Sequence, residues 1–200
     1  RSYADRNEYL ADLDFIDVPV ERLTSKAYAA ERATDITDQA TPSADVGPGL
    51  EPPREGNHTT HFSIVDASGN VVAVTTTLNL SFGSKVTVAG AGFLLNNEMD
   101  DFSAKPGTAN FFGLVQGENN AVEPGKRMLS AMTPTIVSRP DGTPFFVTGS
   151  PGGPRIITTV FQTIVNVVDY GMNVAQAVHA PRVHHQHLPD QIMYEGGALT

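Results

Sequence analysis

Thr59 is the residue of this sequence whose type and position best suit nucleophilic chemistry. It stands where a polar stretch rich in glycine and proline ends and an alternating apolar stretch begins. A threonine hydroxyl is a poor nucleophile unless a base lies beside it. If the bond between His58 and Thr59 is cut, Thr59 gains a free α-amine with an ordinary pKa of about 7.7–8.0. That amine can take the hydroxyl proton without a His or Asp partner.

Thr59 and Thr60 taken alone are also typical of a strand edge, because threonine favours β-structure. Four stretches that follow one another along the chain favour the catalytic interpretation. They read TTHFS (59–63), TTTLN (75–79), LNNEMDDFSAKPG (95–107) and GSPGG (149–153). With these stretches the sequence resembles the γ-glutamyltranspeptidase family, whose members are N-terminal nucleophile hydrolases that cut themselves. The resemblance extends from Tyr3 to the histidine-rich end.

The resemblance implies roles in catalysis for four residues. Thr59 is the expected nucleophile, and its hydroxyl is expected to cut the precursor by attacking the carbonyl of His58. Thr77 matches a threonine whose hydroxyl hydrogen-bonds the nucleophile. Gly152 and Gly153 match an oxyanion hole, and glycine suits this role because its backbone can approach a reacting group closely. The structural alternatives, a strand threonine and a tight turn before a helix, stay open.

Three residues are expected to hold the α-amino group of a γ-glutamyl donor. The resemblance assigns this role to Asn79, Glu98 and Asp101, and the chemistry fits because an ammonium binds carboxylate and amide oxygens. The alternative for the acidic residues is a solvated loop. Ser130 resembles one of two serines that bind the α-carboxylate, and Ala131 stands where the family has the second. The alanine removes one donor from this carboxylate site.

The lid over the site is expected to differ from that of many bacterial relatives. Phe112 lies where those relatives carry a tyrosine on a lid loop, here 106–113, so the hydroxyl that would bond Asn79 is missing. Control of water entry, and with it the balance of hydrolysis against transfer, is left open. The family's other carboxylate ligand, a large-subunit arginine, is expected to lie outside this fragment. Arg127 lies near Ser130, but nothing in the sequence assigns it that role.

A histidine cluster near the end of the chain raises the question of a metal site. It comprises His184, His185 and His187, with His179 nearby. Adjacent residues of a strand point to opposite faces, and the resembled family carries a similar run without metal. We therefore expect no metal and no cofactor. His61 is expected to be a residue of the sheet rather than a catalytic base.

Composition limits the class of protein further. The 200 residues suffice for one domain with a core, and 40% of them are hydrophobic. A formal net charge of -9 argues against a nucleic-acid partner. No apolar stretch approaches the length of about 18 residues that indicates a membrane helix. Because the sequence has no cysteine, disulfides and a thiol nucleophile are excluded.

The part before the expected cut is predicted to be helical and then irregular. Residues 1–36 are expected to be helical, with one helix over 20–32. Residues 37–58 are rich in proline, glycine and acidic residues, which predicts a linker or long exposed loop that carries the cleavage site. The resemblance makes 1–58 the end of the large subunit and 59–200 most of the small subunit. We therefore expect a fragment of a longer precursor.

Strands are predicted to follow the expected cut. A β-hairpin is expected over 60–80, with Gly69 in its turn. This hairpin would bring Thr77 and Asn79 back beside Thr59. Later strands are predicted around a Pro-Asp-Gly turn, after a loop-rich stretch. The loops occupy 81–127, and the later strands 133–137 and 144–148.

Helices are predicted in the last part of the chain. Apolar residues at helical spacing predict a buried helix over 154–169. Asn173 is a suitable N-cap for another helix that ends before Pro181. Strands followed by helices, without βαβ alternation, indicate packed antiparallel sheets with helices outside. The expected fold class is α+β, and the resemblance makes it part of a four-layer αββα sandwich.

The resemblance implies an enzyme that transfers the γ-glutamyl group of glutathione or a similar donor to Thr59. The acyl-enzyme would then pass the group to water, an amino acid or a peptide. The expected protein partner is the remainder of the large subunit, and exported bacterial relatives imply a periplasmic or secreted location. One alternative is a related acylase for cephalosporin side chains or poly-γ-glutamate, which Ala131 and Phe112 leave open. Another is an inactive, uncut fragment.

Overall fold

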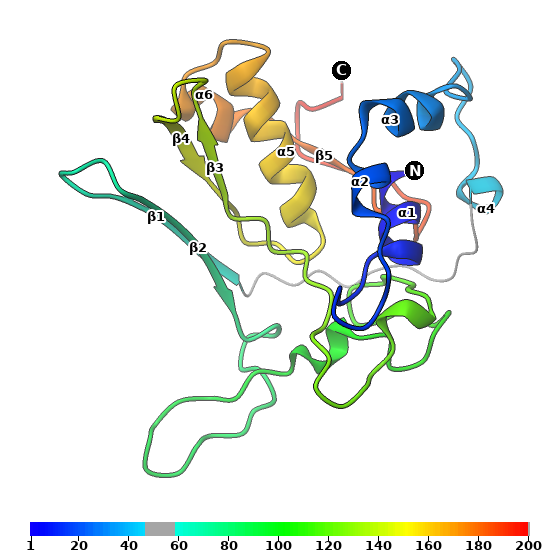
Figure 1. Cartoon of the computed structure of the whole chain (residues 1–200), viewed down its shortest axis with the longest axis vertical. Coiled ribbons are helices and arrows are strands. Elements are labelled where there is room, and N and C mark those ends of the chain that lie inside the picture. The colour runs from blue at the N-terminus through cyan, green and yellow to red at the C-terminus, as the bar shows by residue number, and fades with distance from the viewer. Residues whose placement is uncertain (47–58, 200) are drawn as a thin grey trace. The chain divides into compact units, whose positions relative to one another are not determined.

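The computed structural model describes residues 1–46 and 59–199. These residues form both helices and antiparallel strands, which confirms the α+β class (Figure 1). They divide into two compact units. We name them the loop unit, with residues 1–46, 99–130 and 186–191, and the hairpin unit, with residues 59–98, 131–185 and 192–199.

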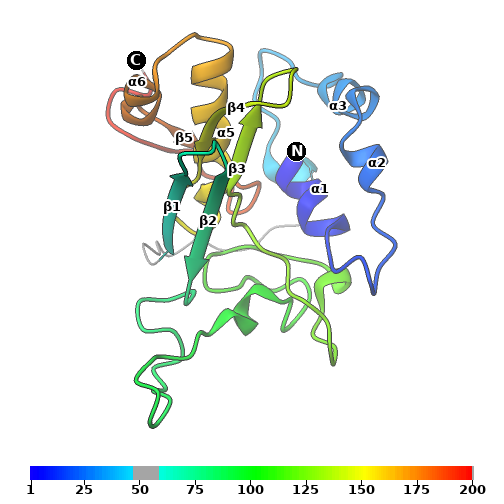
Figure 2. The same cartoon turned by 60° about the vertical axis from the view of Figure 1, so that its left-hand side comes forward.

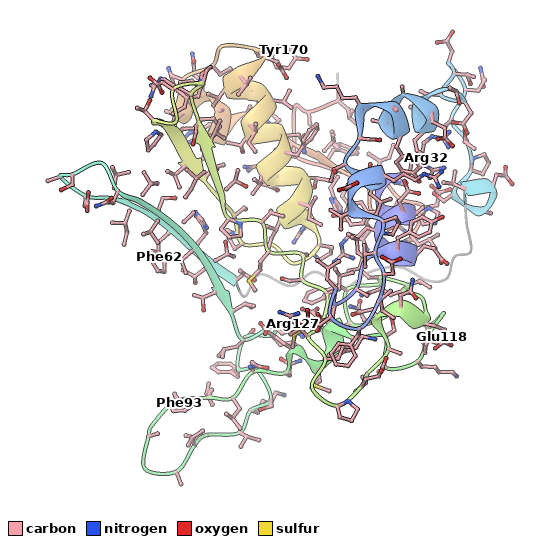
Figure 3. All side chains as sticks on the ribbon, viewed as in Figure 1. Arg32, Phe62, Phe93, Glu118, Arg127 and Tyr170 are labelled. Atoms are coloured by element: carbon pink, nitrogen blue, oxygen red, sulfur yellow. The ribbon has the colours of Figure 1, made fainter. Side chains whose placement is uncertain are left out.

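The hairpin unit begins with the antiparallel hairpin predicted over 60–80. Strand β1 (Thr59–Val65) pairs with β2 (Val71–Thr77), and the register places Thr59 opposite Thr77. Side chains alternate between the two faces of a strand. Thr59, His61 and Ser63 therefore share one face of β1, while the other face carries the exposed Phe62 labelled in Figure 3.

The turn of this hairpin is stabilised by an aspartate. The Asp66 carboxylate accepts hydrogen bonds from the backbone N–H groups of Ser68 and Asn70, both at 2.8 Å. Gly69 adopts a φ of +82°, the left-handed conformation predicted for it. Local turn chemistry thus supports the register that brings the two ends of the hairpin together.

A second hairpin contacts the first. It consists of β3 (Thr135–Ser138) and β4 (Pro144–Thr148), close to the predicted strands. Strand β2 contacts both β3 and β4, and β1 contacts β4. In Figure 1 the second hairpin lies between the β1–β2 hairpin and helix α5 (Arg155–Val168).

Helix α5 confirms the prediction over 154–169, and Ile156 and Val160 on it are buried. The next helix, α6 (Val174–His179), begins at Asn173 as expected. The Asn173 side chain accepts from the Gln176 backbone N–H, and the Gln176 side chain accepts from the Asn173 N–H. This reciprocal capping box fixes the start of α6.

One short strand pair in the hairpin unit was not predicted. Strand β5 (Val183–His184) pairs with β6 (Met193–Tyr194) in antiparallel register. Each strand has two residues. Such a short segment is too brief to show a period of alternation in the sequence.

The loop unit contains short helices and irregular segments (Figure 2). Its helices precede the expected cleavage site. Two 3₁₀ turns lie within the loop-rich stretch that was predicted over 81–127. The first of them begins at Glu98, the last residue of the hairpin unit before the loop unit. The helices are α1 (Ser2–Tyr9), α2 (Val20–Leu23), α3 (Lys26–Ala33) and α4 (Ser43–Val46), and the 3₁₀ turns are η1 (Glu98–Asp101) and η2 (Glu118–Asn120).

Two predictions for the first part of the chain were wrong in detail. The helix expected over 20–32 is interrupted, because Ser25 is extended and its side chain accepts from the Tyr28 N–H at 3.1 Å. This cap starts a new helix instead of continuing the old one. Helix α4 lies inside the stretch predicted as an irregular linker, 37–58. Residues 37–42 are irregular as predicted, and residues 47–58, which include the cleavage-site residue His58, lie outside the described residues.

Buried side chains of both units include polar ones. In the loop unit Phe102, Phe112 and Leu114 are buried together with the amides of Asn120 and Gln186.

In the part of the chain that the structure covers, no helix is long and apolar enough to cross a membrane.

Candidate active site

Thr59 is the first residue of β1 and faces Thr77 across the hairpin. Its Oγ1 donates a hydrogen bond to Thr77 Oγ1 at 3.3 Å, a long distance for two hydroxyls. Catalytic hydrogen bonds are often loose without substrate. The strand register alone brings the predicted nucleophile to its predicted partner.

Asn79 continues this line of contacts. The Thr77 hydroxyl oxygen accepts from the Asn79 backbone N–H at 2.8 Å. Asn79 is buried and adopts a φ of 71°, a conformation that asparagine tolerates better than most residues. Its Nδ2 donates to the Asn97 carbonyl at 3.2 Å, whereas its Oδ1 accepts from none of the residues in the described ranges. That oxygen can therefore accept from a ligand.

Asn97 is a residue that sequence reasoning missed. Its side-chain oxygen accepts from the Leu80 N–H at 3.1 Å, and its own N–H donates to the Leu78 carbonyl at 3.2 Å. Together with the bond from Asn79, these contacts tie the end of β2 to the 95–98 segment. The motif LNNE contained the signal, since an amide beside a sharp turn commonly bonds the backbone.

His61 lies two residues after Thr59, on the same face of β1. Its Nδ1 is 2.9 Å from Thr75 Oγ1 and its Nε2 is 3.0 Å from Ser63 Oγ. Burial lowers the pKa of the imidazole, which favours the neutral ring with one donor and one acceptor nitrogen. His61 is thus a residue of the sheet, as predicted, and both ring nitrogens have hydrogen-bond partners.

The His61 ring packs against Gly149, at the end of β4. A Cβ added to Gly149 would come within 2.6 Å of the ring Cγ, and closer still to Nδ1 and Cε1. Only glycine leaves room for this contact. It places the start of the GSPGG stretch beside the strand that carries Thr59, a relation that the spacing in the sequence does not reveal.

The GSPGG stretch then leads into α5. Gly152 and Gly153 adopt φ values of 132° and 57°, conformations that other residues rarely adopt. Neither backbone N–H has a hydrogen-bond partner among the described residues, and the helix that follows favours negative charge at its start. This is the chemistry required of an oxyanion hole, although the role of the two glycines stays a prediction.

Glu98 opens η1 after the Asn97 segment. Its backbone N–H donates to Asn96 Oδ1 at 3.0 Å. Burial raises the pKa of its half-buried carboxyl. An ammonium ligand would lower that pKa again by stabilising the carboxylate.

Asp101 belongs to the loop unit, together with a buried cation. Arg6 is 8% exposed and its Nη1 donates to Asn7 Oδ1 at 3.1 Å. Burial lowers the pKa of the Arg6 guanidinium, and attraction to Asp101 is one of the effects that oppose this. Ser130 lies in the same unit and is exposed. The structure thus places Asp101 and Ser130 in one unit, with Thr59, Thr77, Asn79 and Glu98 in the other.

Phe112 is 6% exposed within the loop unit. Its ring meets that of Phe111 edge-on, with centroids 5.3 Å apart. Its N–H donates to Asn110 Oδ1 at 3.0 Å, and its carbonyl accepts from Gln186 Nε2 at 3.1 Å. The predicted lid residue is therefore firmly held here, and its action as a lid stays a prediction.

The histidine cluster is divided between the two units. His184 on β5 is buried, and its Nδ1 is 2.7 Å from Thr158 Oγ1 on α5. His187 is buried in the loop unit. Over residues 1–46 and 59–199, no group of three His, Cys, Asp or Glu side chains is arranged to hold a metal ion.

Comparison with known proteins identifies the fold class of this chain and then the family to which it belongs. The chain matches a solved structure of γ-glutamyltranspeptidase from Pseudomonas nitroreducens complexed with L-DON, with a TM-score of 0.65 and 61% identity over 68% of this chain and 70% of that one. The fold is that of the N-terminal nucleophile hydrolases, as predicted. The family model described as Gamma-glutamyltranspeptidase matches residues 1–200. The chain therefore belongs to the γ-glutamyltranspeptidase family.

Two curated relatives bear on the choice between activities. The glutathione hydrolase proenzyme of Escherichia coli (strain K12) is 57% identical over 197 residues, 98% of this chain and 34% of the relative. The acylase ACY 1 proenzyme of Pseudomonas sp. (strain SE83) is 38% identical over 182 residues, 91% of this chain and 30% of the relative. The chain thus spans about a third of the length of the curated relatives it matches.

Proposed function

We propose that this chain carries the nucleophile and much of the donor site of a γ-glutamyl hydrolase and transferase. The observation that carries the proposal is the contact between Thr59 and Thr77 at the start of a strand. The name of the Escherichia coli relative, a glutathione hydrolase proenzyme, supports glutathione as donor and a precursor that is processed.

Self-cleavage is the first step of the proposed reaction. Thr59 Oγ1 attacks the carbonyl carbon of His58, and the acyl group moves from nitrogen to oxygen, which gives an ester. Breaking of the amide C–N bond in this shift frees the α-amine of Thr59, and water then hydrolyses the ester, which restores the Thr59 hydroxyl and releases the His58 carboxylate. Only after this step does the nucleophile have its own base.

Acyl transfer follows the same geometry. The α-amine takes the hydroxyl proton while Oγ1 bonds to the γ-carbonyl carbon of the donor. The backbone N–H groups of Gly152 and Gly153 stabilise the oxyanion. When the intermediate collapses, the amine of the leaving group takes the proton, and a γ-glutamyl ester remains on Thr59. Water, an amino acid or a peptide then accepts the glutamyl group.

Donor recognition uses both charges of the glutamyl α-carbon. Asn79, Glu98 and Asp101 bind the α-ammonium, because each offers an oxygen acceptor. Ser130 donates to the α-carboxylate, with Ala131 unable to add a second hydroxyl. The proposed partner is the remainder of the precursor's large subunit, and the proposed location is the periplasm or the cell exterior.

Substitution of Thr59 in the full-length precursor tests the proposal. Thr59→Ala is expected to stay a single polypeptide and to release no p-nitroaniline from γ-glutamyl-p-nitroanilide, whereas the unchanged protein yields a product that begins with Thr59. Thr60→Ala is the matched control, since Thr60 is exposed on the opposite face. Cleavage and glutamyl release by Thr59→Ala would refute the proposal.

A related acylase is the second candidate, favoured by the 38% identity to ACY 1. The two carboxylates at Glu98 and Asp101 favour a donor with a free α-amine, which a glutaryl amide lacks. Rates with γ-glutamyl-p-nitroanilide and with glutaryl-p-nitroanilide separate the two activities. Preference for the glutaryl substrate would select the acylase, and an uncut protein inactive on both would select the inactive fragment.

A further inference from the structure

Asn120 connects the two loop-unit segments that carry predicted donor ligands. It ends η2 and is 1% exposed, one of the most buried side chains of the described residues. Its Nδ2 donates to the carbonyl oxygen of Asp101 at 2.7 Å. Its Oδ1 accepts from the backbone N–H of Leu129, the neighbour of Ser130, at 3.1 Å. One amide therefore binds the backbone beside both ligands.

A second amide supports this arrangement. Gln116 is 4% exposed, and its Oε1 accepts from Asn120 Nδ2. Its own Nε2 donates to the Asp101 carbonyl at 3.4 Å. The Asn120 carbonyl accepts from the Ser103 N–H at 2.9 Å, so its backbone is also fixed. A buried, fully bonded amide of this kind holds one conformation because any other leaves polar groups unpaired.

We propose that Asn120 is a positioning residue that sets the spacing between the α-ammonium site at Asp101 and the α-carboxylate site at Ser130. The inference rests on the proposed function. The inference adds to that function a residue, Asn120, that determines the preference for a zwitterionic amino-acid head group without touching the substrate. A neutral amide does not titrate, so its effect is geometric and not a matter of protonation.

The expected consequence is selective loss of donor binding. When Asp101 and Ser130 are no longer held at a fixed separation, a bound donor can pair its ammonium or its carboxylate with the protein, but not both at once. The KM for the donor should then rise. Thr59 and Thr77 lie on the hairpin, whose own register orients them, so kcat should change little.

Kinetics of the full-length processed protein test this. Asn120→Ala and Asn120→Asp are each expected to raise the KM for γ-glutamyl-p-nitroanilide at least tenfold, with kcat within threefold. L-glutamate, which carries both charges, should lose inhibition by the same factor. Glutarate, which lacks the ammonium, should inhibit as before. Asn119→Ala is the matched control, because Asn119 Nδ2 donates to the Glu8 carbonyl at 2.8 Å and not to either ligand segment.

Several outcomes would overturn the inference. They are an unchanged KM, an equal loss of inhibition by L-glutamate and glutarate, or the same change in Asn119→Ala. Failure of both Asn120 variants to fold and cut themselves, with Asn119→Ala intact, would also overturn it by making the role purely structural. An unchanged protein that released no glutamyl group would instead refute the proposed function.

Discussion

The β1–β2 hairpin and the loops of residues 98–130 are held by different kinds of hydrogen bond. Backbone groups pair along the hairpin, so Thr59 meets Thr77 through the register. In the loops, side-chain amides bind the backbone: half-buried Asn110 accepts from the N–H groups of Phe112 and Leu114, and buried Asn120 donates to the Asp101 carbonyl. The backbone hydrogen bonds of a hairpin form with many different side chains, whereas the conformation of these loops depends on particular side chains.

This difference separates two kinds of experimental effect. We expect changes on the hairpin to act on the chemical step, because one of its faces carries Thr59, the proposed nucleophile. We expect changes near the loops to act on donor binding or on stability. A hairpin variant that altered only KM, or a loop variant that altered only kcat, would contradict the comparison.

After the complete loss expected of Thr59→Ala, the next largest effect is expected from Gly149→Ala. The added methyl would overlap the His61 ring, so either the ring or the GSPGG stretch must move. Displacement of a reacting group by about 1 Å costs on the order of 100-fold in rate. We expect self-cleavage and kcat to fall by about that factor, measured by gel and by release of p-nitroaniline.

Removal of the ring provides the control. In a His61→Ala background, Gly149→Ala should cost less than about threefold, because the atoms with which the methyl collides are gone. Equal losses in both backgrounds would show that the contact between His61 and Gly149 is not the cause.

Thr77→Val is expected to lower kcat about 10- to 100-fold while leaving KM nearly unchanged. Valine keeps the shape of threonine but removes the hydroxyl that contacts Thr59 and accepts from Asn79. Steady-state kinetics check this. Thr76→Val, on the opposite face of β2, is the control and should retain full activity. A wild-type kcat for Thr77→Val would rule out a catalytic role for this hydroxyl.

Glu98→Gln should raise the donor KM about fivefold, since an amide replaces a carboxylate opposite the ammonium. Burial raises the pKa of the Glu98 carboxyl, so protonation removes the charge at a higher pH than for an ordinary glutamate. In the unchanged protein KM should therefore rise as pH falls through this raised pKa. The variant should lack that rise. The KM of each protein is measured from pH 8 down to about pH 4.5, which is close to the ordinary pKa of a glutamate. An identical pH profile would exclude Glu98 from donor binding.

The smallest effect concerns stability at the Asp12–Arg127 pair of the loop unit; Arg127 is labelled in Figure 3. Buried Asp12 accepts from the Arg127 backbone N–H at 2.8 Å and from its Nε at 3.0 Å. These bonds hold the pKa of the Asp12 carboxyl well below its usual range. The stabilisation is thus present above about pH 4 and is lost as pH falls through the depressed pKa.

Asp12→Asn is therefore expected to lower Tm by roughly 3–6 °C at neutral pH and by less in acid. Thermal unfolding followed by circular dichroism gives both values. Asp14→Asn is the control, because Asp14 also pairs with Arg127 but its side chain is 75% exposed. It should lower Tm by about 1 °C or less. A loss for Asp12→Asn that did not depend on pH would assign its effect to packing instead of charge.

Strong local signals allowed much of the hairpin unit to be predicted from the sequence. The β1–β2 register followed from alternation around the Gly69 turn, and α6 began at its Asn173 cap. The break at Ser25 and helix α4 were missed, because a serine inside good helix formers gives no clear sign of whether its side chain will cap.

The support of the candidate site could not be predicted in the same way. Asn120 and Asn119 are identical in type and adjacent, yet Asn120 bonds the two segments that carry the proposed donor ligands, and Asn119 bonds the Glu8 carbonyl. Likewise, the contact of His61 with Gly149 joins residues far apart in the sequence. Such roles depend on tertiary packing, which residue type and spacing do not encode locally.

The loop unit also implies an order of events in the life of the protein. It combines residues from both sides of the proposed cut. Asp12 accepts from Arg127 Nε at 3.0 Å, and the Ser43 hydroxyl donates to the Asp190 carboxylate at 2.8 Å. Before scission these groups meet within one molecule, and afterwards they join two. Folding of the precursor is then independent of concentration, while renaturation of the mature protein is bimolecular and slows on dilution. If the proposed cleavage takes place, the chain must therefore complete this fold before the bond is cut.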